Sequence, residues 1–234
     1  MKSLFPVFLK LEDRPVLVVG AGKVGEPKIE GLLATGARVT VVAIEVGQAA
    51  QELARAGAIG LHQRAFCPAD LDGVFLAVVA TALRDLNAFV FNEAKRRGVL
   101  CNVVDVPGQC DFFYPAVVRR GDLQIAISTS GQSPSLAQRI RQQLEGQFGP
   151  NYAQWVEELG ETRQLVLASD LPPDQKRDLL QSLASREAFE AALVTEAEKW
   201  LRSSNRDLRA IQENLSSRGA QLADRSSEEG GGIV

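Results

Sequence analysis

A glycine pattern between an apolar run and a helix constrains this chain more than any other feature. Residues 16–19 (VLVV) are typical of a buried parallel strand, and GAGKVG follows at once. Apolar residues then recur at helical spacing to about Thr35. In a GxGxxG turn the first glycine permits the tight bend, the second lets the backbone approach a pyrophosphate, and the third lets helix and strand pack closely. The pattern predicts a dinucleotide site rather than a chance cluster of glycines, with its contacts at Gly20, Gly22, Lys23, Val24 and Gly25.

Strands and helices alternate over roughly the first hundred residues, which indicates an α/β class with a Rossmann-type doubly wound parallel sheet. After the first strand, further strands are predicted at 39–43, 59–65, 74–80 and 99–104, and helices at 22–35, 46–56 and 85–97. The pattern then changes to a hairpin, 113–118 and 123–128, around Arg119-Arg120-Gly121-Asp122. Helices are predicted at 134–147, opened by Ser133 or its neighbour, and at 151–159, 172–183 and 187–202.

Composition excludes several classes of protein. The net charge of −3 gives no general attraction to nucleic acid or an anionic membrane. Three cysteines (Cys67, Cys101 and Cys110) without a CxxC pair, and one histidine, His62, predict neither a disulfide framework nor a metal site. No signal peptide and no apolar span of about 18 residues is visible, so we expect a cytoplasmic protein. The two tryptophans, Trp155 and Trp200, are expected to pack helices.

The acid that would bind a ribose is less clearly marked than the glycines. Glu45, 20 residues after Gly25, is the nearest candidate, although a solvated loop glutamate fits as well. No arginine stands at the tip of the second predicted strand to meet a 2′-phosphate, since Arg38 is at that strand's start. These residues favour NAD over NADP.

Longer motifs give the chain a family resemblance over about residues 1–150. They are FPVF at 5–8, VLVVGAGKVG, Ala80-Thr81 with Asn87 beyond, CNVVD at 101–105, and FFYPAVVRRGDLQIAISTSGQSPSLAQRIRQQLE at 112–145. With these the chain resembles the precorrin-2 dehydrogenase and sirohydrochlorin ferrochelatase family, which includes the N-terminal part of the fused sirohaem synthases. It departs from the family in two places. Where A-x-R-K usually follows the loop, Gly25-Glu26-Pro27-Lys28 stands here, without the family's arginine, and Ala82-Leu83-Arg84-Asp85 stands where acidic residues usually follow Ala80-Thr81. Pro27 removes an amide near the first helical turn and can shift or kink the start of the helix.

The resemblance implies a homodimer whose subunits have three parts. They are an NAD-binding Rossmann domain at 1–108, a dimerisation segment at 109–149 and a helical C-terminal domain at 150–223, with a disordered tail at 224–234. It also implies NAD-dependent oxidation of precorrin-2 to sirohydrochlorin, with insertion of ferrous iron by some members. A non-enzymatic NAD-sensing module is the other alternative, and we expect such a module to carry a DNA-binding motif that this sequence does not show.

Asp105 is the candidate catalytic residue. It follows the last predicted Rossmann strand, at the edge where open α/β sheets hold their ligands. A carboxylate there could take a ring proton, stabilise cationic character on the macrocycle, or receive pyrrole protons as iron enters. The alternative is a cap of the turn before Val106-Pro107-Gly108, and the family match favours catalysis.

Three further residues are candidate cofactor contacts, namely Thr81, Asn102 and Val104. Thr81 could instead cap the next turn, and Asn102 could bond the backbone. For the carboxylate-rich substrate we expect a hydroxyl-rich loop and arginine clamps, because free amides, hydroxyls and guanidinium groups bind carboxylates. The loop residues are Ser128, Thr129, Ser130, Gly131 and Ser133. The arginines are Arg119 and Arg139, with Arg120 and Arg141 as further candidates, and for any one of them a solvated position is the alternative.

Overall fold

A computed structural model describes residues 4–193 of the 234-residue chain. Its contacts group the chain into two compact units. The first runs to Ala116 and also takes in Ser128–Ala137, and the second comprises Val117–Ile127 and the described residues from Gln138 on. The predicted tail, Trp200 and the end of the helix predicted at 187–202 lie outside the described residues.

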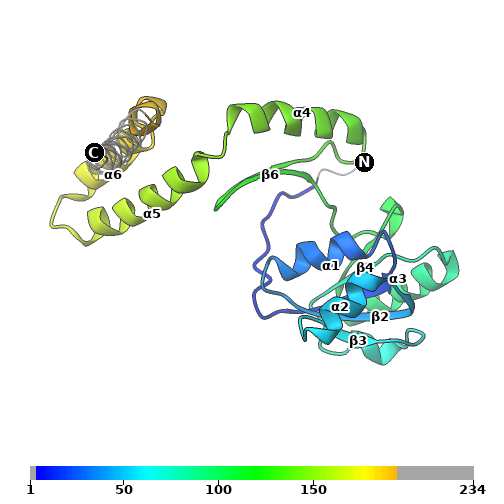
Figure 1. The fold of residues 1–234 in the computed structure, drawn as a ribbon. Coiled ribbons are helices and arrows are strands. Elements are labelled where there is room, and N and C mark those ends of the chain that lie inside the picture. Colours follow the sequence, from blue (N-terminus) through cyan, green and yellow to red (C-terminus); the bar gives the residue numbers. More distant parts are fainter. Residues whose placement is uncertain (1–3, 194–234) are drawn as a thin grey trace, which may run out of the picture. The chain divides into compact units, whose positions relative to one another are not determined.

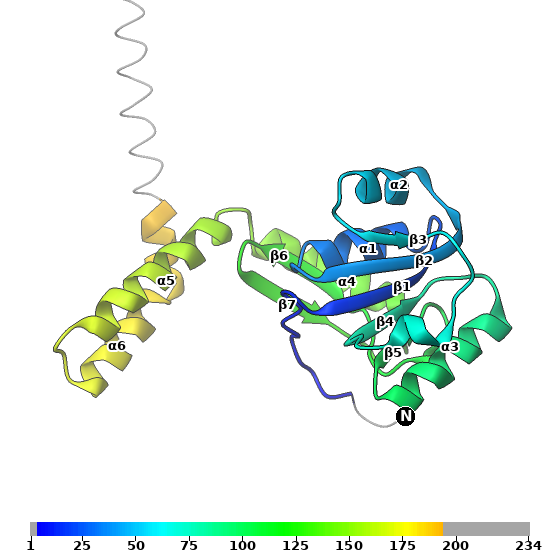
Figure 2. The ribbon, with the colours of Figure 1, turned by 90° about the horizontal axis from the view of Figure 1, so that it is seen from below.

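The first unit holds a five-stranded parallel sheet. Its strands are β1 (Pro15–Ala21), β2 (Arg38–Val46), β3 (Gly60–His62), β4 (Leu76–Val79) and β5 (Leu100–Val103). Figure 2 shows them in the order β3-β2-β1-β4-β5, all parallel. The predicted Rossmann-type class is confirmed. The strand order reverses between β1 and β4, and ligands of such sheets bind at the carboxyl ends of the strands beside that point.

Alternating residues of β1 face two separate apolar layers. Val16 and Val18 pack in the layer that includes Ile29 of α1 (Glu26–Leu33) and Ala50 of α2 (Gln48–Arg55). Leu17 and Val19 pack in the layer that includes Val90 of α3 (Arg84–Arg97). The sheet is therefore covered on both faces, which explains why β1 and β4 read as continuous apolar runs (Figure 1).

Several element boundaries differ from the sequence prediction, and two of these differences bear on the glycine turn. Helix α1 begins at Glu26 rather than Gly22, because residues 22–25 form a turn in which the Gly25 amide donates to Gly22 O at 2.8 Å. Pro27 then falls in the first turn of the helix, where no amide partner is lost. Strand β2 continues to Val46, which pairs with Ala21 after a register shift, so α2 starts at Gln48.

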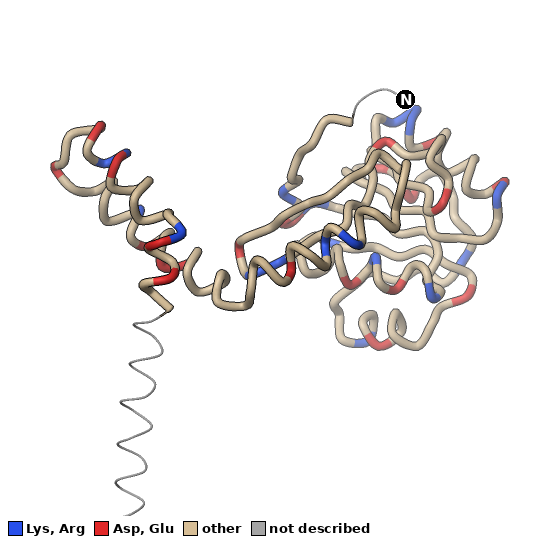
Figure 3. The backbone as a smooth tube through the Cα atoms, turned by 90° about the horizontal axis from the view of Figure 1, so that it is seen from above, with Lys and Arg blue, Asp and Glu red and all other residues tan. Residues whose placement is uncertain are grey.

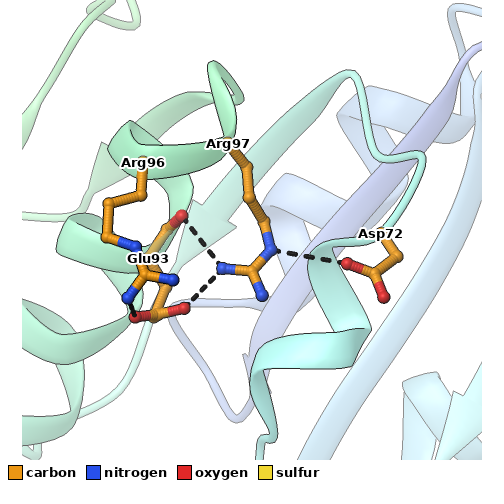
Figure 4. A network of polar contacts seen from close by, with 4 residues as sticks. All are labelled: Asp72, Glu93, Arg96 and Arg97. Atoms are coloured by element: carbon orange, nitrogen blue, oxygen red, sulfur yellow. Dashed lines mark hydrogen bonds and ion pairs between the residues drawn. The ribbon is translucent and has the colours of Figure 1, made fainter.

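An ion-pair network holds the end of α3, as Figure 4 shows. The side chain of Glu93 is buried and accepts from Arg96 at 2.9 Å and from Arg97. Arg97 also reaches Asp72 at 3.4 Å, in the loop after the 3-10 turn Pro68–Leu71. This network fastens α3 to that loop, on the face opposite α1.

Beyond the sheet, β6 (Ala116–Arg120) and β7 (Leu123–Ile127) form the predicted hairpin, and α4 (Pro134–Gln147) has the predicted bounds. Within the second unit, Arg120 Nε donates to Phe148 O at 2.7 Å, beyond the end of α4. Helix α5 (Tyr152–Ala168) runs past Gly160, and α6 (Pro173–Leu183) follows. Trp155 packs against Tyr152 and Phe189, as expected for a residue that joins helices.

Candidate functional site

The three glycines of the β1–α1 turn have different surroundings. Gly20 has φ +100°, and a Cβ there would lie 2.5 Å from Ala80 O. A Cβ on Gly25 would lie 2.3 Å from Gly20 O. Gly22 has neither restriction, because a Cβ there would meet nothing within 4 Å and its φ is not positive. The first and third glycines thus serve the fold, whereas the space at the second is open to a ligand.

The turn also offers free donors. In the part of the chain that the structure describes, the amides of Lys23 and Val24 donate no hydrogen bond, and α1 starts after the next residue, Gly25, which is its N-cap. Unpaired amides at a helix N-terminus bind anions, since the helix dipole adds positive charge. These residues fit a pyrophosphate.

An open groove of about 640 Å³ lies beside this turn. Gly22 and Lys23 line it from the glycine loop, and Glu45 lines it from the end of β2. Glu26 of α1 and Glu52 of α2 also line it. Sequence reasoning singled out Glu45 but missed the other two acids, which only the packing of α1 against α2 brings to this groove. The groove is acidic, and Figure 3 shows that elsewhere in each unit charges of both signs are interspersed.

The ends of β1, β4 and β5 lie side by side. Ala80 N donates to Val19 O at 2.8 Å, and Val104 N donates to Val79 O at 2.9 Å. These bonds align the ends of the three strands, so that Gly20, near the end of β1, and Thr81 and Asp105, each the second residue after its strand, lie along one edge of the sheet. Val104 itself is half-buried against the core.

Asp105 is in a left-handed conformation, with φ +62°. Its side chain is exposed, and no residue in the described part of the chain accepts from it or donates to it. The 3-10 turn that follows (Pro107–Gln109) has Val106 at its N-cap and no side-chain cap. The carboxylate therefore does not cap this turn, which was the alternative to catalysis.

Thr81 and Asn102 both have structural partners. Thr81 Oγ1 donates to Asn87 Oδ1 at 2.6 Å and accepts from the Leu83 amide at 3.1 Å, at the start of α3. The buried Asn102 Nδ2 donates to Phe112 O at 2.8 Å. The structural alternatives considered for these two residues are present, and their contact with a cofactor stays a prediction.

The hydroxyl-rich loop is folded by its own side chains. Ser128 Oγ accepts from the Ser130 amide at 3.1 Å, and Thr129 Oγ1 accepts from the Ser133 amide at 3.1 Å. Ser133 Oγ caps α4 by accepting from the Leu136 amide at 3.2 Å, as predicted. Ser130 and Gly131 have positive φ. This loop belongs to the same compact unit as the sheet.

The four candidate arginines divide into two pairs. Arg120 donates to the carbonyls of Phe148 and Glu145, and Arg141 pairs with Glu145, so both are engaged within the second unit. Arg119 and Arg139 are exposed, and their guanidinium groups have no partner among the described residues. Only these two remain available to a ligand's carboxylates.

The remaining features concern the histidine, the oxidation state of the cysteines, metal ligands and membrane spans. His62 is exposed in β3. All three cysteines are free, and the described residues contain no cluster of metal-ligating side chains. Among residues 4–193, no helix has the length and apolar character needed to cross a membrane.

Sequence reasoning missed the contacts that hold the Asp105 loop. Cys110 Sγ donates to Val103 O at 3.2 Å and to Val106 O at 3.3 Å. Asp111 Oδ2 accepts from the Cys101 amide at 3.0 Å. The only signal in the sequence was the position of Cys110 and Asp111 shortly after CNVVD, and no periodicity marks them.

Comparison with known proteins agrees with this architecture. Residues 7–116 match the family model "Putative NAD(P)-binding", and residues 120–147 match the model "Sirohaem biosynthesis protein central". Siroheme synthase 1 of Serratia proteamaculans is 41% identical over 158 residues, which are 68% of this chain and 33% of that protein. Siroheme synthase of Methylococcus capsulatus is 37% identical over 193 residues, 82% of this chain and 41% of that protein. The chain thus spans about a third to two fifths of the length of these curated relatives.

A solved structure covers the chain more completely. SirC, precorrin-2 dehydrogenase, is 31% identical and aligns with a TM-score of 0.71 over 84% of this chain and 100% of that one. Sheet, hairpin and following helices therefore recur together in a protein of similar extent. The chain belongs to the sirohaem synthase N-terminal type, the precorrin-2 dehydrogenase and ferrochelatase family.

Proposed function

We propose that the protein oxidises precorrin-2 to sirohydrochlorin with NAD. The observation that carries this proposal is the common sheet edge, where an open anion-binding turn at Gly22 lies in line with an unpaired carboxylate at Asp105. A dehydrogenase of this kind needs both a dinucleotide site and a group that accepts a proton, and the two must lie near one another. The structural relative SirC is described as a precorrin-2 dehydrogenase, which supports precorrin-2 as the substrate.

The described residues fit NAD. The Lys23 and Val24 amides would hold the pyrophosphate, and the open space at Gly22 would admit it. Glu45 would accept from a ribose hydroxyl, whereas the carboxylates of Glu26, Glu45 and Glu52 would repel a 2′-phosphate. When bound, the nicotinamide supplies the hydride acceptor. The groove thus favours NAD over NADP.

Asp105 would act on the substrate as a general base. Its carboxylate is exposed at the ligand edge and is not committed to another group, so it is free to take the ring proton that leaves as the macrocycle is oxidised. Its charge would also stabilise cationic character on the ring before that proton departs.

The substrate's carboxylates need positive or donor groups, since the chain itself has a net charge of −3. Arg119 and Arg139 are unpaired and would meet carboxylates in a fork-like geometry. The loop with Ser128, Thr129, Ser130, Gly131 and Ser133 would offer hydroxyls and amides. Arg120 and Arg141 are not proposed, because the fold uses them.

The test is an anaerobic assay in which precorrin-2 and NAD are added to the purified protein and the absorbance of both NADH and sirohydrochlorin is followed. We expect one NADH for each sirohydrochlorin formed. Omission of NAD is the control. Binding of NAD without any oxidation would contradict the proposal and favour a sensing module instead.

Ferrous iron added afterwards tests the second activity known in the family, insertion of metal into sirohydrochlorin. The macrocycle supplies the nitrogens, so a protein whose described residues hold no metal cluster could still perform it. Asp105 would then receive the pyrrole protons. Conversion to sirohaem faster than in a protein-free control supports this activity.

We also propose that the protein is a homodimer joined through residues 109–149. A two-stranded sheet such as β6–β7 is marginally stable unaided and gains from a further partner surface. Sedimentation equilibrium at micromolar concentration is expected to give twice the mass of the chain. Monomer alone would contradict this assembly.

A further inference from the structure

The loop that carries Asp105 leaves β5 and returns to it. Asn102 and Cys110 form an antiparallel bridge at its neck. The Asp111 amide donates to Cys101 O at 2.8 Å, and the Cys101 amide donates to Asp111 Oδ2 at 3.0 Å. The two ends of the loop are therefore fixed beside each other, which sets the position of the Cys110 backbone.

From this neck the Cys110 side chain reaches the turn that contains Asp105. That turn closes through the Val106 amide, which donates to Val103 O at 3.1 Å. Cys110 Sγ lies 3.2 Å from Val103 O and 3.3 Å from Val106 O, so it meets the carbonyls on either side of Asp105. Asn102 Nδ2 donates to the same sulfur at 3.4 Å, and thus supports it from the strand.

The chemistry of the thiol suits this task. Its single proton can bond one carbonyl at a time or be shared between the two. Burial, and to a lesser extent the charge of Asp111, raise the pKa of Cys110, so the thiol keeps its proton at neutral pH.

Asp105 needs such support, because a positive φ is strained for a residue with a side chain and persists only where surrounding contacts impose it. Its own carboxylate forms no hydrogen bond in the described part of the chain that could hold the turn. The contacts that impose the conformation must therefore come from the backbone of the turn and from the side chain that contacts its carbonyls, Cys110.

We propose that Cys110 is a positioning residue, whose thiol holds the 103–106 turn from inside the loop and keeps the Asp105 carboxylate at the ligand edge. This inference rests on the catalytic role proposed for Asp105. Cys110 does not touch the substrate or the cofactor, and it acts only through the conformation of that turn.

A double-mutant cycle tests the coupling. Cys110→Ala removes the donor and is expected to lower kcat about two- to fivefold, since a thiol is a weak donor, with the NAD dissociation constant unchanged. Cys110→Ser keeps a donor and should restore most of the rate. Cys67→Ala, which removes a thiol outside this loop, is the matched control and should leave kcat unchanged. In an Asp105→Asn background, Cys110→Ala should cause no further loss, because residues that act as a unit are not additive.

The outcomes distinguish an error about Cys110 from an error about Asp105. If Asp105→Asn lowers turnover but Cys110→Ala does not, or if the two losses multiply, the positioning role is wrong and the proposed function stands. If Asp105→Asn has wild-type turnover, the catalytic role and this inference fall together.

A second measurement does not depend on activity. The backbone NMR shifts of Asp105 report its left-handed conformation, and we expect them to move in Cys110→Ala but not in Cys110→Ser. Cys110→Val fills the space without a donor and takes the place of the alanine variant if that does not fold. Unchanged Asp105 shifts in a folded variant without the donor would overturn the proposal.

Discussion

The two loops at the ligand edge of the sheet, the β1–α1 glycine loop and the Asp105 loop after β5, are built in opposite ways. The glycine loop depends on the absence of side chains, since a Cβ at Gly20 or Gly25 would collide with backbone. The Asp105 loop depends on their presence, since Asn102, Cys110 and Asp111 hold it at the neck and from within. GxGxxG loops generally bind the pyrophosphate of a dinucleotide through backbone amides, which any residue can supply if its side chain leaves room for the ligand. A proton acceptor must be one side chain in one place, and its loop requires more contacts.

The largest expected effect is in the Asp105 loop, at the proposed catalytic residue. Asp105→Asn should lower kcat by about a hundred- to ten-thousand-fold, the usual result of losing a general base. Asparagine tolerates positive φ at least as well as aspartate, so the turn should keep its conformation and NAD should bind normally. Steady-state formation of sirohydrochlorin, with calorimetry of NAD as the control, measures both. Normal turnover would return Asp105 to a structural role and direct the search to residues 128–133.

In the glycine loop, Gly22→Asp should weaken the affinity for NAD about ten- to a hundredfold without unfolding the protein. The backbone at Gly22 accepts any residue, and its Cβ would meet nothing within 4 Å, so the only conflict is between the new carboxylate and the pyrophosphate. Isothermal titration with NAD and a thermal melt separate affinity from stability. Wild-type affinity in the variant would place the cofactor elsewhere.

Gly25→Ala should instead lower stability more than NAD affinity, and its overall effect should be smaller. Its Cβ would lie 2.3 Å from Gly20 O, so α1 must move away from β1, at a cost of about 1–3 kcal/mol in the free energy of unfolding. The melting temperature should fall, while NAD affinity at a temperature where the protein is folded changes less than in Gly22→Asp. A variant as stable as the wild type would show that the contact relaxes freely.

The smallest effect concerns an ion pair outside both loops, in the segment between β3 and β4. Arg64 donates to Asp70 at 2.6 Å, and this hydrogen bond lowers the pKa of the Asp70 carboxyl. Because the folded pKa is depressed, the pair stabilises the fold above the unfolded pKa of Asp70 and ceases to do so as pH falls through the folded value. Asp70→Asn should therefore lower stability by about 1 kcal/mol or less at pH 7, and by progressively less as the pH falls below the unfolded pKa of the carboxyl. Denaturant unfolding at pH 7 and at a series of acidic pH values would show it, and a loss that does not change with pH would contradict the ion-pair explanation.

Local patterns predicted the parts of this molecule that local physics determines. The β1 run, the glycine turn, the hairpin and the bounds of α4 follow from apolar periodicity and turn chemistry. The start of α1 was missed because the turn at 22–25 looks helical in sequence and only the Gly25-to-Gly22 bond reveals it. Likewise α5 was expected to end near Gly160, but packing among helices outweighs the cost of about 1 kcal/mol that glycine imposes.

Within the candidate site, the sequence indicated which residues could react but not what holds them. The availability of Arg119 and Arg139, in contrast to Arg120 and Arg141, depends on which guanidinium groups find partners in the folded chain. The same is true of Thr81, whose hydroxyl is shared with Asn87. Which of the available partners a side chain meets, whether four residues away as for Arg141 or 28 as for Arg120, leaves no periodic trace, so these contacts required the structure.

The open space at Gly22 also makes this position suitable for a mutation that separates the two activities known in the family. Because the fold leaves space for a side chain at this position, we expect a variant such as Gly22→Asp to weaken dinucleotide binding with little effect on the fold. In a family whose members can both dehydrogenate a macrocycle and load it with iron, such an allele is a separation-of-function tool, since metal insertion requires no nicotinamide. Cells that carry it and are given sirohydrochlorin would report on the second activity with the first one silent.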